Sequence, residues 1–133
     1  MPDVLLIGFA PDTIPGFEPG AVAAQLREGS ARFEELGMTE EQCLVGFGDP
    51  DAAATVVEHL KRKLYDCVVV GGGIRKPAEF LELFQSVVNL VHRHQPQAAI
   101  AFNSGPTDSA DWALKALEQR AGTTSVGVAA NKL

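Results

Sequence analysis

Three consecutive glycines and two cations follow an apolar segment that ends at Val70. Glycines let a backbone approach a ligand closely, and arginine and lysine attract anions. The helix predicted to begin at Pro77 follows Lys76, whose side chain has no oxygen to accept hydrogen bonds from the first helical amides. This combination predicts a phosphate or carboxylate site, and the alternative is a tight strand-to-helix turn without a ligand. The candidate ligand-binding residues of this turn are Gly71, Gly72, Gly73, Arg75 and Lys76.

A long loop over residues 8–20 follows the first apolar run and contains three prolines. Loops of this length are often functional lids, although some are only decoration. Asp12 is a candidate general base, and Thr13 is a second candidate ligand-binding residue. The alternative for Asp12 is a structural ion pair with Arg75, and this alternative is the favoured one.

Asn103 and Ser104 stand where the last apolar run ends. An amide and a hydroxyl at this position are expected to point toward the same site. The alternative is a turn before the next helix, because Asn, Ser, Gly and Pro all favour turns. Asn103 is therefore a candidate polar anchor and, together with Asp12, a candidate catalytic residue, and Ser104 is a candidate for ligand binding.

No motif identifies a cofactor. Gly71 and Gly73 begin a dinucleotide-type pattern, but Lys76 occupies the position of its third glycine. The chain has no GxxxxGK[ST] segment and no Cys or His spacing typical of a metal site. The sequence therefore predicts no metal and leaves the cofactor unknown.

Four apolar runs alternate with amphipathic helical segments. Each run is continuous, as expected for parallel strands that helices cover on both faces. The pattern predicts a three-layer α/β sandwich with a four- to five-stranded parallel sheet in the order 2-1-3-4-(5). Ligands of such sheets bind between the carboxyl ends of the first and third strands, where the two loops described first would meet. The predicted strands span residues 4–9, 43–47, 67–71 and 98–103, and the last two predicted helices span 77–95 and 109–121.

The length of 133 residues fits one domain over residues 1–122. Residues 123–133 are expected to be a short edge strand, a flexible tail or a sequence added for expression. The net charge of −6 and the short apolar runs disfavour nucleic-acid and membrane partners, and they favour a cytoplasmic protein. Cys43 and Cys67 lie in apolar runs and are expected to be buried without a disulfide.

The alternation of strands and helices over about residues 3–121 resembles flavodoxin-like and receiver-like domains. The resemblance implies only the fold of these families, because their specific motifs do not match this sequence. Glycines occupy the place of the phosphorylated aspartate of a receiver, and "FAPDTIPG" occupies the place of the Ser/Thr-rich phosphate loop of a flavodoxin. The segments "GGGIRKP" and "FNSGPTD" are also similar to small bacterial and fungal proteins without a known activity.

These features predict a small α/β protein that binds an anionic metabolite at the carboxyl ends of strands one, three and four. An enzymatic version would be a cofactor-independent lyase, isomerase or hydrolase, with Asp12 as the base and glycine-loop amides stabilising an oxyanion. The alternative is a regulatory or scaffolding module. In that case the apolar helix 77–95 would pair two copies of the chain or bind a partner protein.

Overall fold

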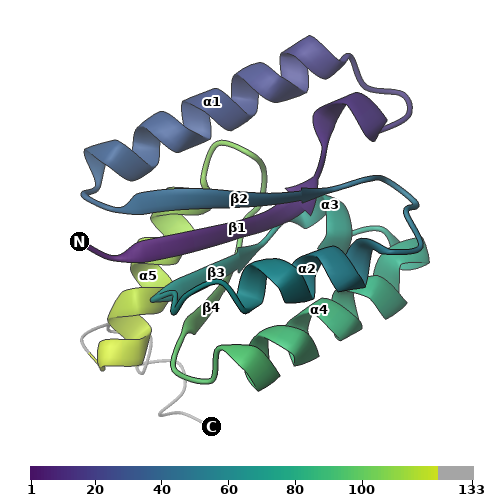
Figure 1. The fold of residues 1–133 in the computed structure, drawn as a ribbon. Helices are drawn as coiled ribbons and strands as arrows, with labels where there is room; N and C mark the ends of the chain where they lie inside the picture. The colour runs from purple at the N-terminus through teal and green to yellow at the C-terminus, as the bar shows by residue number, and fades with distance from the viewer. Residues whose placement is uncertain (123–133) are drawn as a thin grey trace, which may run out of the picture.

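The computed structural model describes residues 1–122, which form a four-stranded parallel sheet with helices on both faces (Figure 1). The strand order is β2-β1-β3-β4, which confirms the predicted order of the first four strands. The predicted fifth strand or tail over 123–133 lies outside the described residues. In chain order the elements are β1 (Asp3–Phe9), η1 (Pro11–Thr13), α1 (Pro19–Glu35), β2 (Thr39–Val45), α2 (Ala52–Leu60), β3 (Cys67–Val70), α3 (Gly72–Arg75), η2 (Ala78–Phe80), α4 (Leu81–His94), β4 (Ala99–Phe102) and α5 (Ser109–Ala121).

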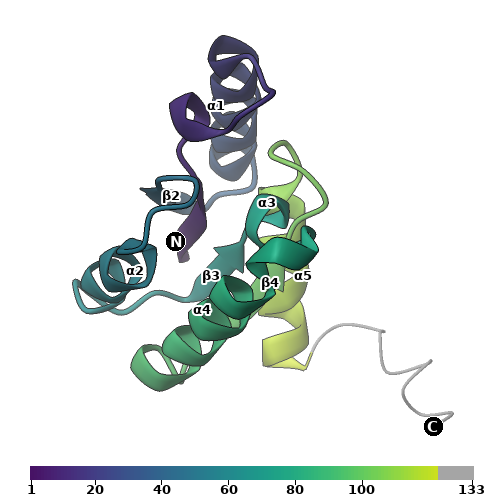
Figure 2. The same ribbon diagram turned by 90° about the vertical axis from the view of Figure 1, so that its right-hand side faces the viewer.

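The continuous apolar runs form the centre of the molecule because the sheet is covered on both sides (Figure 2). All four residues of β3 are buried, and alternate strand residues face opposite layers. Leu5 and Ile7 pack with α2 and α4, and Val4 and Leu6 pack with α1 and α5. The two apolar layers fix the carboxyl ends of β1, β3 and β4 at one edge of the sheet.

Strand β2 begins earlier than the apolar run predicted. The prediction placed it over residues 43–47, and it spans Thr39–Val45. As an edge strand, β2 pairs only with β1, so its polar first half extends the parallel ladder while alternate side chains face solvent. The run of apolar residues therefore marked only the buried half of the strand.

The helix predicted over 77–95 is divided into two elements, η2 and α4, and a third short helix precedes it. The turn of glycines is itself the short helix α3, Pro77 precedes the 3₁₀ turn η2, and the regular helix α4 begins only at Leu81. Lys76 is still helical, but Pro77 lacks the amide hydrogen that a continuing helix needs and is itself extended, with a ψ of 132°, so α3 is separated from α4 there. Most apolar side chains of α4 pack against the core, although Leu81 is 63% exposed. Helix α5 begins and ends where the sequence predicted.

Candidate functional site

A cleft of about 530 Å³ opens at the carboxyl ends of β1 and β3. This position is the topological switch point of the sheet, where ligands of open α/β folds bind. Helix α1 lies on one side of this edge, and α3 with the segment 103–108 lies on the other (Figure 2). The described residues that line the cleft are Leu6, Gly8, Phe9, Ile14, Phe17, Val22, Gln25, Leu26, Leu44, Phe47, Gly71, Gly72, Gly73, Lys76, Pro77, Asn103, Ser104, Gly105 and Pro106.

The floor of the cleft is open because Gly8 interrupts the apolar residues of β1. A Cβ atom built at Gly8 would meet only the Cδ2 atom of Leu44, at 3.9 Å. Leu6 and Leu44 border the same space from the sheet, and Val22 and Leu26 border it from α1. Most of the cleft is therefore apolar, and Gly8 leaves room where a larger side chain would fill it.

Helix α1 packs closely on the 103–108 segment, and this contact bounds the cleft between them. A Cβ atom at Gly29 would lie 2.3 Å from the carbonyl oxygen of Pro106, so only glycine fits this position without a shift of the backbone. Gly29 is buried within α1. The contact holds α1 and the polar segment at a fixed distance from each other.

Asn103 joins the glycine turn to the end of β4. Its Oδ1 atom accepts a hydrogen bond from the Gly72 amide at 2.7 Å, and its Nδ2 atom donates to Ser109 Oγ at 2.8 Å. Asn103 is only 5% exposed, so these bonds satisfy a buried amide on both sides. The predicted polar anchor thus lies beside the glycine turn and holds it through the first amide of α3.

The prediction that a long helix starts at Pro77 and leaves its first amides free for an anion is wrong. Helix α3 has four residues, and the Gly72 amide at its start already donates to Asn103. Ala78 and Glu79 belong to the 3₁₀ turn η2 and not to the first turn of a long helix. The short helix α3 begins five residues before the predicted start, and the regular helix α4 begins four residues after it. Gly71 fits before α3 because a Cβ atom there would lie 3.1 Å from the Ile7 carbonyl oxygen.

Arg75 and Lys76 both reach across to the 103–104 backbone. The Arg75 Nη2 atom donates to the Asn103 carbonyl oxygen at 2.7 Å, and its guanidinium lies 5.9 Å from the ring centre of Phe102. The Lys76 Nζ atom donates to the Ser104 carbonyl oxygen. Lys76 lines the cleft and Arg75 does not. Within residues 1–122, neither cation forms an ion pair with a carboxylate.

Asp108 stabilises the polar wall of the cleft. Its carboxylate accepts hydrogen bonds from the amides of Ser104 and Gly105, from Ser104 Oγ and from Trp112 Nε1. Partial burial acts in the opposite direction, but these donors together lower the pKa of Asp108 below its ordinary value. The carboxylate therefore holds Ser104, a predicted site residue, at the rim of the cleft.

The loop after β1 contributes its apolar residues to the cleft and its polar residues to its own structure. Thr13 Oγ1 donates to the Ala10 carbonyl oxygen at 2.6 Å and accepts a hydrogen bond from the Phe47 amide at 3.0 Å. Asp12 is exposed and does not line the cleft. The ion pair expected between Asp12 and Arg75 is not formed in the described part of the chain. The structure therefore does not bring Asp12 and Thr13 to the other predicted site residues.

Sequence reasoning missed the apolar half of the cleft. The sequence places Gly8 in the strand predicted over residues 4–9, and it gives Val22 and Leu26 no role in a site. An isolated glycine within a buried strand is a signal for close approach or open space, and it could have identified the floor. The contributions of Gln25 and Pro106 had no comparable signal, because they depend on how α1 packs against the 103–108 segment.

Comparison with protein-family models finds no match for this chain, and comparison with curated proteins finds none either. The fold and the cleft are therefore the observations from which function is inferred. No three His, Cys, Asp or Glu side chains within residues 1–122 are grouped so that they could hold a metal ion. In the same part of the chain, no helix has the length and apolarity needed to cross a membrane.

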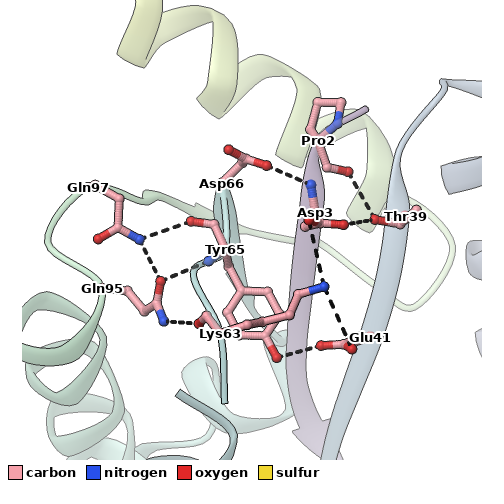
Figure 3. A network of polar contacts seen from close by, with 9 residues as sticks. All are labelled: Pro2, Asp3, Thr39, Glu41, Lys63, Tyr65, Asp66, Gln95 and Gln97. Atoms are coloured by element: carbon pink, nitrogen blue, oxygen red, sulfur yellow. Dashed lines mark hydrogen bonds and ion pairs between the residues drawn. The ribbon is translucent and has the colours of Figure 1, made fainter. Parts of the chain in front are cut away.

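A second polar cluster lies at the opposite, amino-terminal end of the sheet (Figure 3). Gln95 is 2% exposed, and its Oε1 atom accepts hydrogen bonds from the Tyr65 amide at 2.9 Å and from Gln97 Nε2 at 2.6 Å. Its Nε2 atom donates to the carbonyl oxygens of Leu60 and Lys63 at 2.8 and 2.7 Å. One buried amide therefore connects the end of α2, the start of β3 and the end of α4.

The charged part of this cluster surrounds Tyr65. The buried Tyr65 hydroxyl donates to Glu41, and Lys63 Nζ lies 3.7 Å from Asp3 Oδ2 and 3.9 Å from Glu41 Oε1 (Figure 3). Burial, followed by the bond to Glu41, raises the pKa of Tyr65 above its ordinary value. The Tyr65 ring fills the interior beneath these groups, so the cluster is a structural network.

Proposed function

We propose that the chain binds a small molecule with a phosphate or carboxylate group in the cleft at the carboxyl ends of β1, β3 and β4. The observation that carries the proposal is the position of Lys76, a cation without a carboxylate partner in residues 1–122, on the lining of a largely apolar cleft. The cleft volume of about 530 Å³ is within the range of small-molecule sites, roughly 300–1,000 Å³. Most lysine and arginine side chains of residues 1–122 also lack an ion pair, so the place of Lys76 on an apolar lining, and not its missing partner, is what distinguishes it.

The residues of the polar wall have different roles in this proposal. Lys76 is the direct donor to the anion, and Ser104 lies beside it at the rim. Arg75 acts as a positioning residue, because its guanidinium holds the Asn103 carbonyl and does not line the cleft. Asn103 positions the glycine turn in the same way. The proposal is one of binding, because Asp12 lies outside the lining and the Asn103 amide is already engaged on both sides.

The proposal is tested by thermal unfolding with inorganic phosphate, phenyl phosphate and phenylacetate as probes. The wild type is compared with Lys76→Met and with Lys115→Met, a matched control on α5 that lies outside the cleft. We expect at least one anion to raise the melting temperature of the wild type and of Lys115→Met, and to raise that of Lys76→Met much less. The proposal is wrong if no anion shifts the wild type, or if Lys76→Met responds as the wild type does.

Self-association through residues 77–95 is the second candidate function. The observation that favours it is Leu81, which begins α4 and is 63% exposed. Most other apolar side chains of α4 pack on the core, so Leu81 is the residue to change. A sizing measurement on Leu81→Asp is expected to show a smaller species than the wild type. An unchanged elution volume, or a monomeric wild type, rules this candidate out.

A further inference from the structure

We infer that the ligand of the cleft is an amphipathic monocarboxylate, with its carboxylate at Lys76 and its apolar body against α1. The inference rests on the proposed function, because it specifies which class of anion the same cleft takes. Three features carry it: the number of cations on the lining, the apolar character of the remaining walls and the open floor at Gly8.

The end of the cleft at Lys76 and Ser104, where the carboxylate would bind, carries one positive charge. Lys76 is the one charged side chain among the described residues that line the cleft. Its ammonium group has three donor hydrogens, and one of them is directed at the Ser104 carbonyl oxygen. Two donors remain, which match the two oxygens of a carboxylate. An aliphatic phosphate monoester carries about −1.5 to −2 charges at pH 7, so a single lysine would leave part of that charge unpaired.

Arg75 does not supply a second charge to the cleft. Its Nη2 atom donates to the Asn103 carbonyl oxygen at 2.7 Å, and its guanidinium lies against Phe102. Lys76 and Ser104 are both exposed, so water reaches the head group, and the lining itself supplies one positive charge. A ligand with one negative charge therefore matches the charge of the lining.

The rest of the cleft suits an apolar ligand body. Val22, Leu26 and Leu44 face it from α1 and β2, and Gly8 leaves the floor between them open. Phe17 lines the cleft but is 65% exposed, so an apolar body would cover a side chain that otherwise faces water. Each methylene buried against such walls is expected to tighten binding about fourfold.

The class of ligand is tested by titrating the full chain with butanoate, hexanoate and octanoate, and then with octan-1-ol and octyl phosphate. Amide chemical shifts report the dissociation constants. We expect affinity to rise about fourfold per methylene across the carboxylates. We expect octanoate to bind about tenfold or more tightly than octan-1-ol, because a charge-assisted hydrogen bond is lost in the alcohol. Octyl phosphate is expected to bind more weakly than octanoate.

The outcomes separate this inference from the proposed function. If octyl phosphate binds as tightly as octanoate or more tightly, the carboxylate class is wrong while the anion site stands. If affinity does not depend on chain length, the inference that an apolar ligand body packs against α1 is wrong. If the alcohol binds as tightly as octanoate, or if no probe binds, the anion site fails as well.

Two variants test where each end of the ligand lies. Gly8→Leu fills the floor and is expected to weaken octanoate about tenfold or more while leaving butanoate nearly unchanged. Lys76→Met is expected to weaken octanoate and to leave octan-1-ol unchanged, with Lys115→Met behaving as the wild type. If Gly8→Leu does not fold, Gly8→Ala replaces it, because its Cβ meets only Leu44, and a smaller loss of octanoate affinity is expected. If a folded Gly8 variant binds octanoate as tightly as the wild type does, the apolar body of the ligand does not lie over Gly8.

Discussion

The two ends of the parallel sheet both hold polar clusters, but the two clusters differ in what surrounds them. At the amino-terminal end the Tyr65 ring fills the interior, and Lys63 lies near the carboxylates of Asp3 and Glu41 (Figure 3). At the carboxyl-terminal end Gly8 leaves space, and Lys76 has no carboxylate partner in the described residues. Polar density alone therefore does not mark a site. A hollow of about 400 Å³ also lies at the amino-terminal end beside Gln95 and Arg120, so open space next to a cation does not suffice either. The carboxyl-terminal cleft differs because the walls around Lys76 are largely apolar.

The largest expected effect is at the amino-terminal end, from Gln95→Ala. The change removes four hydrogen bonds from a buried amide and leaves backbone groups of Tyr65, Leu60 and Lys63 without partners. We expect the free energy of unfolding to fall by about 3 kcal/mol, measured by urea denaturation. Gln97→Ala, at an exposed position of the same network, is the control and should cost about 1 kcal/mol or less. Similar losses for both variants would show that the network does not depend on Gln95.

A smaller effect on stability, with an effect on binding, is expected from Asn103→Ala. The change removes the acceptor of the Gly72 amide and the donor to Ser109. We expect a loss of about 2 kcal/mol in the free energy of unfolding, together with weaker anion binding because the turn that carries Lys76 is no longer held. Gln95→Ala, by contrast, should still bind anions at temperatures where it is folded. If Asn103→Ala binds as the wild type does, the glycine turn is held without Asn103.

The smallest effect is expected from Tyr65→Phe, which removes only the hydroxyl bonded to Glu41. We expect a loss of about 1 kcal/mol at pH 7. The folded pKa of Tyr65 is raised, so this stabilisation is complete below the ordinary tyrosine value near pH 10 and is lost as pH rises through the higher folded value. Because Tyr65 is the single tyrosine of the chain, ultraviolet absorbance follows its ionisation directly. A titration midpoint near pH 10 in the folded protein would show that the hydroxyl is not held as described.

The sequence predicted the order of the four strands because continuous apolar runs between amphipathic helices leave few arrangements for a parallel sheet. It also placed the glycine turn beside Asn103, since the carboxyl ends of β3 and β4 meet at one edge. It did not predict that β2 starts at Thr39, because an edge strand does not need two apolar faces. The start of α3 was missed because a glycine carries no helix signal of its own.

The chemistry of the site was harder to predict than the fold. Arg75 and Lys76 are adjacent in sequence and look alike, yet one faces Phe102 and the other lines the cleft. That difference depends on the path of the 103–104 backbone, which supplies both carbonyl acceptors. The apolar wall depends on where α1 lies, and the contact of Gly29 with Pro106 fixes that position. Contacts between segments so far apart in the chain leave no local pattern.

The central claim is that the carboxyl-terminal cleft, and not the amino-terminal network, is the binding site. Its most direct test is an amide ¹H–¹⁵N correlation spectrum of the full chain, titrated with octanoate and separately with phenyl phosphate. We predict saturable shifts for the amides of Gly8, Gly72 and Ser104, with those of Tyr65 and Gln95 unmoved. Shifts that cluster at Tyr65 and Gln95, or no saturable shift with either probe, would contradict the claim.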